Sequence, residues 1–405
     1  MWVRKRIDIG WGGIGYGLLR CLFPGKAVEH ERSIASQLPR PEEAVICFSV
    51  RSGFDLLLTA LKFPEGSEIL LSAMTLGHMA DIVRAHGLVP VPVDLDPDTM
   101  APDMNALERS IRPETRMLVV AHLFGGRCRM ERIVEICRRR NILLIEDMAQ
   151  ALGSGRRWGG GQSDVAMFSF GTIKTATAGG GAVLRVRDAE LGNEMRVAQA
   201  GYPLQRRMPF AIKLGRIACL KFLGYRFPYG LFRRLCGKLR IDADLVISRG
   251  TRAFPGNNLI VMIRRRPHPA LIALLSHRLS QFDPRYLRRK TMIGRLLRDE
   301  LSCMVDMPGK NALAQTHWVF PLCLGNSGEV IRKLVAEGFD ATARQSMEVI
   351  HAPAGREEME PTRIAEIYDR MVYLPAYPEM GAREIMRMAR VLSVTLNGVA
   401  RGAGK

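Results

Sequence analysis

The sequence predicts an α/β fold with a mostly parallel central sheet in a large domain and a smaller α/β domain at the C-terminus. Three observations predict it. Short apolar runs alternate with helical patterns in the first half of the chain, which is typical of a parallel sheet covered by helices on both faces. The 405 residues suffice for a large core and two domains. After about residue 267 a second series of helix and strand patterns begins.

The predicted elements follow one another in a regular order. The strands are the short apolar runs Ala44–Ser49, Glu68–Ser72, Val89–Val93, Arg116–His122, Asn141–Glu146, Ser163–Phe170 and Gly181–Arg187. The helices between most of them are the amphipathic stretches Phe54–Leu61, Leu76–His86, Met104–Ile111 and Met130–Arg140. The later part is expected to contain helices at Ala270–Phe282 and Val330–Gly338 and a strand at Val372–Pro375. In such sheets ligands bind at the carboxyl ends of the strands.

Two runs that follow or end predicted strands carry chemistry. Residues 145–150 contain Asp147 just beyond a strand, and residues 168–175 contain Ser169 and, five positions later, Lys174. An amine that bonds to an aldehyde, an acid for a pyridine nitrogen and a hydroxyl for a phosphate are the groups that pyridoxal 5'-phosphate (PLP) requires. The sequence therefore predicts a PLP site, with Lys174 as the Schiff-base lysine and Asp147 as the partner of the ring nitrogen.

With these runs and the following Gly179-Gly180-Gly181, the chain resembles the DegT/StrS-type sugar aminotransferases of the aspartate aminotransferase superfamily. The resemblance covers roughly Glu42 to the C-terminus and rests on the joint order and spacing of the motifs. It implies the PLP-dependent transferase fold. It also implies ping-pong transamination, in which Lys174, once displaced by substrate, moves a proton between the substrate carbon and the cofactor.

The resemblance assigns further residues to the cofactor. Ser52 and Gly53 stand where the family has Ser-Gly-Thr at a helix start, a place that favours an anion. Leu76 replaces the aromatic residue that normally stacks on the cofactor, and Ser169 would contact the phosphate. Gln150 would lie near the ring and its phenolic oxygen, although a glutamine that merely faces a helix is an open alternative.

Two departures from the family pattern leave further alternatives open. Phe54 replaces the threonine of Ser-Gly-Thr, so Ser52 could instead be a simple helix cap. Arg264 stands where the family has an asparagine that reaches across a dimer interface to the neighbour's PLP phosphate. A guanidinium can take that role and would make the enzyme a homodimer. The run Arg264-Arg265-Arg266 could equally be a solvated or lipid-facing basic segment.

The positive charge is concentrated in two segments. The formal net charge is +19, and residues 201–266 carry 15 Lys/Arg against 2 Asp/Glu, whereas residues 1–26 carry 5 against 1. Compared with the family, the gap between Lys174 and Arg264 is longer by several dozen residues. We therefore expect an N-terminal basic and aromatic segment (1–41), a large PLP-binding domain (42–266) with a basic insertion at about 201–262, and a small C-terminal domain (267–405).

The insertion predicts amphipathic helices with a cationic side at Phe210–Gly224 and Tyr229–Arg240. Neither run is long and apolar enough to span a membrane. We expect residues 1–26 and 201–266 to contact an anionic membrane surface. The alternative is that these helices pack on the enzyme's own body or at the dimer interface. The N-terminal contact would use the aromatic and basic side chains Trp2, Arg4, Lys5, Arg6, Trp11 and Tyr16.

These observations favour a PLP-dependent transaminase that moves an amino group from an amino acid, expected to be glutamate, to a keto group. The acceptor would be a sugar or a lipid-linked compound, and the protein would be cytoplasmic and peripheral on the inner face of the membrane. The alternatives are a soluble nucleotide-sugar aminotransferase and a catalytically lapsed PLP fold serving as a membrane scaffold.

Three other classes of function are not expected. Nucleic-acid binding is disfavoured because the apolar residues between the basic ones suit acyl chains better than bases. The eight cysteines show no metal-ligand spacing and no CxxC pair, so we expect neither a metal nor disulfides. Residues 10–15 match G-x-G-x-x-G, yet the strand and acidic residue of a dinucleotide site do not follow.

Overall fold

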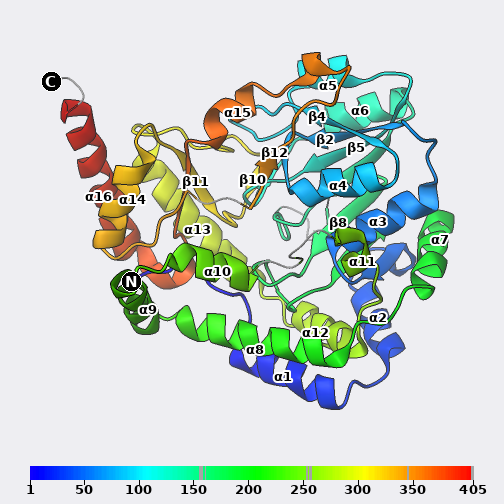
Figure 1. Cartoon of the computed structure of the whole chain (residues 1–405), viewed down its shortest axis with the longest axis horizontal. Helices are drawn as coiled ribbons and strands as arrows, with labels where there is room; N and C mark the ends of the chain where they lie inside the picture. Colours follow the sequence, from blue (N-terminus) through cyan, green and yellow to red (C-terminus); the bar gives the residue numbers. More distant parts are fainter. Residues whose placement is uncertain (155–157, 160, 252–253, 255–257, 344–345, 403–405) are drawn as a thin grey trace.

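A seven-stranded sheet forms the centre of the computed structural model, which describes the chain except residues 155–157, 160, 252–253, 255–257, 344–345 and 403–405. The strand order is β1-β9-β8-β7-β5-β2-β4 (Figure 1). Its strands are β1 (Ala44–Cys47), β2 (Glu68–Ser72), β4 (Val89–Val93), β5 (Thr115–Ala121), β7 (Leu143–Asp147), β8 (Val165–Ser169) and β9 (Ala182–Val186). Strands β8, β7, β5, β2 and β4 run parallel, and β9 is antiparallel to β1 and β8. The predicted mostly parallel sheet is confirmed.

Both faces of this sheet are buried under helices. Successive residues of β2 show why, because side chains alternate between the two faces of a strand. Ile69 packs in a core with the helices at Val50–Leu61 and Gly77–Ala85. Leu70, on the other face, packs in a core with the helices at Met104–Ser110 and Glu131–Arg139. The helices are α3 (Val50–Leu61), α4 (Gly77–Ala85), α5 (Met104–Ser110), α6 (Glu131–Arg139) and α7 (Ala189–Ala200).

A second, smaller body follows the sheet in the chain and has its own core. Two short antiparallel ladders connect it to the sheet body: β12 (Glu348–Val349) pairs with β3 (Met74–Thr75), and β10 (Ala314–Gln315) with β6 (Gly126–Arg127). The helix α12 (Pro269–Ser280) comes before this body in the chain and packs against the sheet body. The other elements of the smaller body are α13 (Pro284–Leu301), β11 (Phe320–Cys323), α14 (Ser327–Ala336), α15 (Arg363–Tyr368), β13 (Met371–Leu374) and α16 (Gly381–Gly402). The domain boundaries stay a prediction.

The basic insertion folds into helices, as predicted. They are α8 (Arg207–Leu223), α9 (Arg226–Lys238), α10 (Ala243–Thr251) and α11 (Leu259–Ile263). Figure 1 shows α8 beside the N-terminal helix α1 (Trp11–Leu22), near α2 (Ala27–Ala35). Phe210, Leu214 and Ile217 of α8 are buried against the rest of the chain, so the alternative of internal packing is correct for that side of α8.

Gly17, near the N-terminus, serves helix packing. In α1, a Cβ at Gly17 would stand 2.8 Å from Leu274 of α12 and 3.0 Å from Leu214 of α8. Gly17 therefore lets three helices approach closely, and residues 11–15 form the first turn of α1. Within the described residues, none of the helices has the length and hydropathy needed to cross a bilayer.

Residues 2–9, which we call the N-terminal strap, run between the two bodies. The Trp2 indole donates to Glu384 of α16 at 2.8 Å, and Arg4 binds the buried carboxylate of Asp340 at 2.9 Å. The expectation that Trp2 and residues 4–6 face a membrane is therefore wrong. Their charge and aromatic character serve internal contacts, a use that composition alone does not distinguish from lipid binding.

Candidate active site

Lys174 lies in the loop that leaves β8, where the sequence placed it. Its backbone N–H donates to the Gly171 carbonyl at 2.9 Å, and its ammonium lies 4.3 Å from the centroid of the Trp318 ring. Burial lowers the pKa of Lys174 to about 8, the charge of Asp147 opposes this, and the charge of Arg51 adds to it. A larger share of this amine is therefore neutral near pH 8 than for an exposed lysine, which suits a nucleophile.

Asp147 is the last residue of β7, and β7 pairs in parallel with β8. Adjacent parallel strands end at the same edge of a sheet, which brings Asp147 into electrostatic contact with Lys174. One oxygen, Oδ1, accepts the Ala149 N–H at 2.9 Å. Burial raises the pKa of the carboxyl, opposed by that hydrogen bond and by nearby cations. The carboxylate has no ion pair in the described part of the chain, so a ligand cation can supply one.

The neighbouring Glu146 has a structural task on the opposite face of the strand. Its Oε1 accepts a hydrogen bond from Nε2 of His122 at 3.1 Å, since Nδ1 of that ring already accepts the Cys128 N–H. Its Oε2 accepts from the Ser163 hydroxyl. The two adjacent acids are thus separated by the strand pleat: Glu146 is buried in polar packing and Asp147 remains at the site.

Ser169 ends β8 near Lys174. A Cβ built on Gly171 would lie 3.7 Å from Oγ of Ser169 and 3.9 Å from Cγ of Lys174, so the three residues form one compact turn. The Gly171 N–H points toward Oγ of Ser169 at 3.5 Å. The hydroxyl is half-exposed and retains donor capacity, as a phosphate contact requires.

Gln150 is held between the two bodies by its amide group. Its Oε1 accepts the Phe124 N–H at 2.9 Å, and its Nε2 approaches Sδ of Met347 at 3.1 Å. Leu76 precedes α4 and packs in the cores around β3 and α3. The contacts of Gln150 and Leu76 with PLP stay predictions.

Ser52 and Gly53 lie in the first turn of α3, but their donors already have partners. The Ser52 hydroxyl donates to the Ile263 carbonyl at 2.7 Å, and the Ser52 N–H donates to Oγ of Ser49 at 3.1 Å. Ser49 is thus the helix cap, so the alternative that Ser52 caps α3 is wrong. A Cβ at Gly53 would meet Leu184 at 2.5 Å, which gives this glycine a packing reason. Phosphate binding by Ser52 and Gly53 stays a prediction.

Arg51 and Lys213 are two cations that the sequence motifs did not identify. Nε of Arg51 is buried without a hydrogen-bond partner in the described residues. Lys213 reaches from α8 to the glycine loop after Lys174, where its Nζ would stand 3.8 Å from a Cβ at Gly180. Burial, followed by the charge of Arg51, lowers the pKa of Lys213 to about 8. The adjacency of Arg51 to Ser52 was an available signal, whereas nothing in the sequence linked Lys213 to the loop.

Arg264 binds within its own chain. Its Nε and Nη2 donate to the two oxygens of the buried Asp55 carboxylate, each at 3.0 Å, and His86 contacts the same carboxylate at 2.9 Å. This bidentate geometry explains why an arginine follows α11. A contact from Arg264 to a neighbouring subunit's phosphate stays a prediction.

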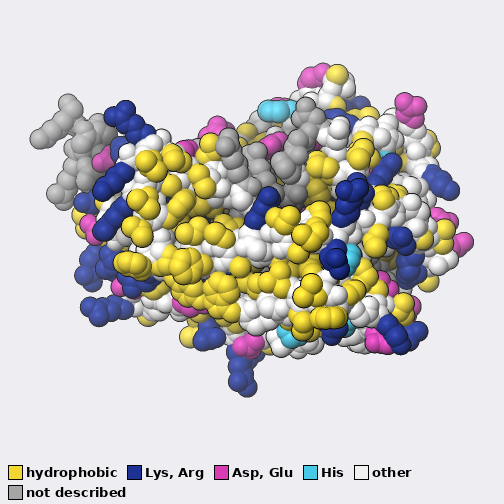
Figure 2. Space-filling view, turned by 60° about the horizontal axis from the view of Figure 1, so that its bottom comes forward, with side chains coloured by type: hydrophobic (Ala, Val, Ile, Leu, Met, Phe, Trp, Pro, Cys, Tyr) yellow, Lys and Arg dark blue, Asp and Glu magenta, His cyan; other side chains and the backbone are white. Residues whose placement is uncertain are grey.

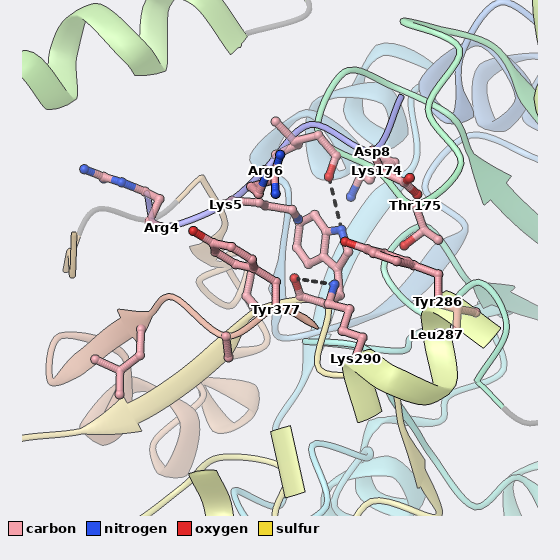
Figure 3. Close-up of a pocket in the computed structure, with 15 residues that line it drawn as sticks. Arg4, Lys5, Arg6, Asp8, Lys174, Thr175, Tyr286, Leu287, Lys290 and Tyr377 are labelled. Carbon is pink, nitrogen blue, oxygen red and sulfur yellow. Dashed lines mark hydrogen bonds between the residues drawn. The ribbon is translucent and has the colours of Figure 1, made fainter. Parts of the chain in front are cut away.

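The residues at this site fit PLP. An amine with a lowered pKa, an acid without an ion pair and a half-exposed serine hydroxyl occur together at the strand ends. The orphaned buried Nε of Arg51 and the nearby charge of Lys213 would be offset by a phosphate. Beside Lys174 a narrow cleft with a volume of about 30 Å³ lies between the two bodies (Figure 3).

Comparison with known proteins agrees with this geometry. The profile of the DegT/DnrJ/EryC1/StrS aminotransferase family matches residues 25–209, which include Asp147 and Lys174. GDP-perosamine synthase from Caulobacter vibrioides is 35% identical over 188 residues, covering 46% of this chain and 50% of the relative. The namesake from Escherichia coli O157:H7 is 34% identical over 138 residues, covering 34% and 38%. The matches thus span half the length of these curated relatives or less.

Solved structures show the same fold over the whole chain. The aminotransferase TlmJ from Streptoalloteichus hindustanus superposes with a TM-score of 0.70 at 20% identity, covering 98% of this chain and 100% of that one. PseC from Helicobacter pylori, an aminotransferase involved in pseudoaminic acid biosynthesis, superposes with a TM-score of 0.69 at 16% identity, covering 98% and 99%. The cofactor of the matched family is pyridoxal phosphate. Residues 25–209, a little less than half of the chain, thus resemble the DegT/DnrJ/EryC1/StrS aminotransferase family.

Proposed function

We propose that this protein is a PLP-dependent aminotransferase that takes an amino group from glutamate and delivers it to the keto group of a nucleotide-linked sugar. The observation that carries the proposal is Lys174, whose pKa is lowered to about 8 and which lines the cleft near a carboxylate without an ion pair, Asp147. The name of the curated relatives, GDP-perosamine synthase, supports a nucleotide-linked sugar as the acceptor.

Each protein group would have a defined task. PLP, when bound, supplies an electron sink that stabilises charge on the reacting carbon. Asp147 would hold a proton on the ring nitrogen, and Ser169, Arg51 and Lys213 would bind the phosphate. Lys174 would hold the cofactor covalently and then accept and return the proton that moves during transamination. The cleft between the bodies would admit the donor and the acceptor in turn.

A direct test uses the purified protein loaded with PLP. Adding glutamate should change the absorbance of the bound cofactor and release 2-oxoglutarate in equal amount. Adding a nucleotide-linked keto sugar should then restore the first spectrum. If neither glutamate nor any other amino acid changes the spectrum of wild-type protein that has PLP bound, the aminotransferase proposal is wrong.

The covalent bond to PLP should form with a pH dependence set by Lys174. Only the neutral amine attacks the aldehyde, and its pKa is lowered from 10.5 to about 8. Below pH 8 the rate should therefore rise about tenfold per pH unit, and above about pH 8 it should level off, whereas an unperturbed lysine would continue to about pH 10.4. Rapid-mixing absorbance of the apoprotein with PLP measures this. A rate that still climbs beyond pH 10 would contradict the lowered pKa.

A second candidate, favoured by the surface of α1, α8 and α9, is a version of this enzyme that works at a membrane on a lipid-linked keto acceptor. Figure 2 shows hydrophobic side chains gathered across the side of the molecule where Figure 1 places α1 and α8. The three helices contain no Asp or Glu. Their exposed apolar side chains, which we call the apolar face, are Trp11, Leu18, Leu19, Leu22, Met208, Ile212, Phe222, Phe227, Leu231 and Leu235.

Basic side chains on the same helices would complement an anionic lipid surface. Arg207, Arg216, Arg226, Arg234 and Lys238 are all exposed. Each such residue contributes about 1 kcal/mol near anionic lipid, in addition to burial of the apolar face. This supports a peripheral contact through α1, α8 and α9, with the N-terminal strap excluded from it.

Substitutions on the apolar face should weaken vesicle binding. Phe227 is 83% exposed and Leu19 is 53% exposed, so replacing either by glutamate leaves the core intact. The replacement removes an apolar side chain that would be buried in the membrane and adds a negative charge that anionic lipid repels. We expect F227E and L19E to bind vesicles of anionic lipid about tenfold more weakly or worse, as measured by sedimentation.

The matched control is V394E on α16, a residue 65% exposed that lies outside the apolar face. It adds the same charge and should bind like the wild type. Failure of the wild-type protein to sediment with anionic vesicles at low salt would remove the membrane candidate and leave the nucleotide-sugar enzyme.

The proposal also includes a homodimer, following the family resemblance. Analytical ultracentrifugation of the PLP-loaded protein should give twice the mass of 45.2 kDa. A monomer with full activity would exclude a phosphate contact from a neighbour's Arg264.

A further inference from the structure

The N-terminal strap is fixed at both ends and passes the candidate active site between them. At one end, Trp2 and Arg4 bind the smaller body through Glu384 and Asp340. At the other, Asp8 accepts the Ala176 N–H through Oδ2 at 2.6 Å, two residues beyond Lys174. The middle of the strap, including Lys5, is therefore held in the wall of the cleft (Figure 3).

Three lysines meet around Trp318 in this wall, two of them at its indole ring and one at its backbone carbonyl. The ammonium of Lys5 lies 3.1 Å from the centroid of the Trp318 ring, and that of Lys174 lies 4.3 Å from the same centroid. Lys290 of α13 donates to the Trp318 carbonyl at 3.3 Å, as Figure 3 shows. The ring itself is fixed, because its Nε1 donates to the Ile173 carbonyl at 3.2 Å.

Neither Lys5 nor Lys290 forms an ion pair within the described residues, although the Asp8 carboxylate acts electrostatically on both lysines and Glu379 acts on Lys290. The ammonium of Lys5 is buried without a hydrogen-bond partner among those residues. Burial and the charges of Lys290 and Lys174 lower the pKa of Lys5, and burial lowers that of Lys290 to about 8. Buried ammonium groups without partners are costly, and a bound anion removes that cost.

The other charged groups of the cleft already have partners. Arg4 is bound to Asp340 and Asp244, and Arg6 lies 3.2 Å from Glu379. The carboxylate Asp8 is occupied by Ala176 and Arg278. An anion that enters the cleft would therefore meet Lys5 and Lys290, two lysines that have no ion pair in the part of the chain that the structure describes.

We propose that Lys5 and Lys290 form a binding site for the carboxylate of the amino-acid donor. The α-carboxylate of an amino acid lies two bonds from the nitrogen that reacts at Lys174, and Lys5 shares the Trp318 ring with Lys174. The buried position of Lys5 suits a small anion. The diphosphate of a nucleotide sugar is bulkier and lies across the sugar ring from the reacting carbon.

This inference rests on the proposed function, so the test follows the two half-reactions separately. The variants are K5M and K290M in full-length PLP-loaded protein, with R6M as the matched control because the charge of Arg6 is already paired. In K5M and K290M, the glutamate concentration for half-saturation should rise about 10- to 100-fold, the usual range for losing a charged hydrogen bond. R6M should change it less than about threefold. The half-reaction with the keto acceptor should stay within the same threefold in all three variants.

Two further measurements separate carboxylate binding from a structural role. Glutarate, an unreactive dicarboxylate, should bind K5M about 10- to 100-fold more weakly than wild type in calorimetry. The reaction of 4-aminobutyrate, which is glutamate without its α-carboxylate, should be unaffected by K5M. Thermal melting should show K5M folded, since a thioether replaces an unpaired ammonium.

The outcomes are distinct. If K5M and K290M leave glutamate and glutarate binding unchanged, or strengthen it, the carboxylate site is disproved. A loss confined to the half-reaction with the keto acceptor would assign the two lysines to its phosphates and also overturn the inference. If wild-type protein does not react with any amino acid, the proposed function fails, and glutarate binding still reports on Lys5 and Lys290.

Discussion

Replacing Lys174 by alanine should abolish transamination and the covalent attachment of PLP. In the proposed mechanism, the amine is both the group that bonds to the cofactor aldehyde and the base that moves the substrate proton. Loss of a positioned general base alone typically costs about 10²- to 10⁴-fold, and loss of the covalent bond adds to it. K174A should still fold, because the side chain lines a cleft and lacks an ion pair among the described residues. Borohydride reduction followed by peptide mass mapping measures the attachment directly.

The neighbouring lysines provide the control for that experiment. Lys5 lies on the same Trp318 ring as Lys174, and Lys290 donates to the carbonyl of that residue. K5M and K290M should retain a labelled peptide containing residue 174 after reduction. Label on Lys5 or Lys290 in the wild-type protein, or label persisting in K174A, would move the reactive amine to another residue and disprove the assignment.

Replacing Arg4 by alanine should destabilise the folded protein by about 3–5 kcal/mol, the usual cost of leaving a buried charge without its partner. The Asp340 carboxylate has no exposed side-chain surface, and it accepts from Arg4 through Nε at 2.9 Å and Nη2 at 3.0 Å. The Tyr229 hydroxyl donates to it as well, at 2.6 Å, but brings no positive charge. Denaturant unfolding followed by circular dichroism measures the change.

R6A is the matched control for R4A. Arg6 is also an arginine of the N-terminal strap, but its ion pair with Glu379 is partly exposed on both sides, at 27% and 40%. Such pairs contribute about 0–1 kcal/mol. Equal losses for R4A and R6A would show that the strap, and not the buried carboxylate, determines the effect. An unchanged stability of R4A would show that Asp340 is satisfied without it.

The fold and the position of the reactive lysine could be predicted because they depend on local patterns. Each strand of the sheet is a short apolar run, and the runs appear in the sequence as they do in the structure. Asp147 and Lys174 come together because each follows or ends one of two adjacent parallel strands. The motif order of the family adds the chemical roles. The strands and the positions of Asp147 and Lys174 can be predicted from hydrophobic periodicity, because they depend on stretches of about 30 residues or fewer.

The wall of the cleft could not be predicted in the same way, because it is made by contacts between distant parts of the chain. The hydrogen bond from Trp318 to Ile173 joins residues 145 positions apart. Nothing near Lys5 in the sequence distinguishes a residue of the cleft wall from a membrane anchor. For this reason the expected membrane contact of Trp2 and residues 4–6 is wrong. Lys213 likewise belongs to a helix, α8, and the sequence of α8 does not show which of its sides packs on the loop at Gly179–Gly181.

The N-terminal strap constrains the order in which this enzyme can become active during synthesis on the ribosome. Its contacts with Asp340 and Glu384 span 336 and 382 positions, so Trp2 and Arg4 are synthesised long before their partners. The sheet body can form earlier, since domains generally fold as they emerge. A nascent chain would then carry a reactive lysine with one wall of its cleft missing. The cleft would thus be complete only once residues 340 and 384 have been synthesised and have folded against the strap.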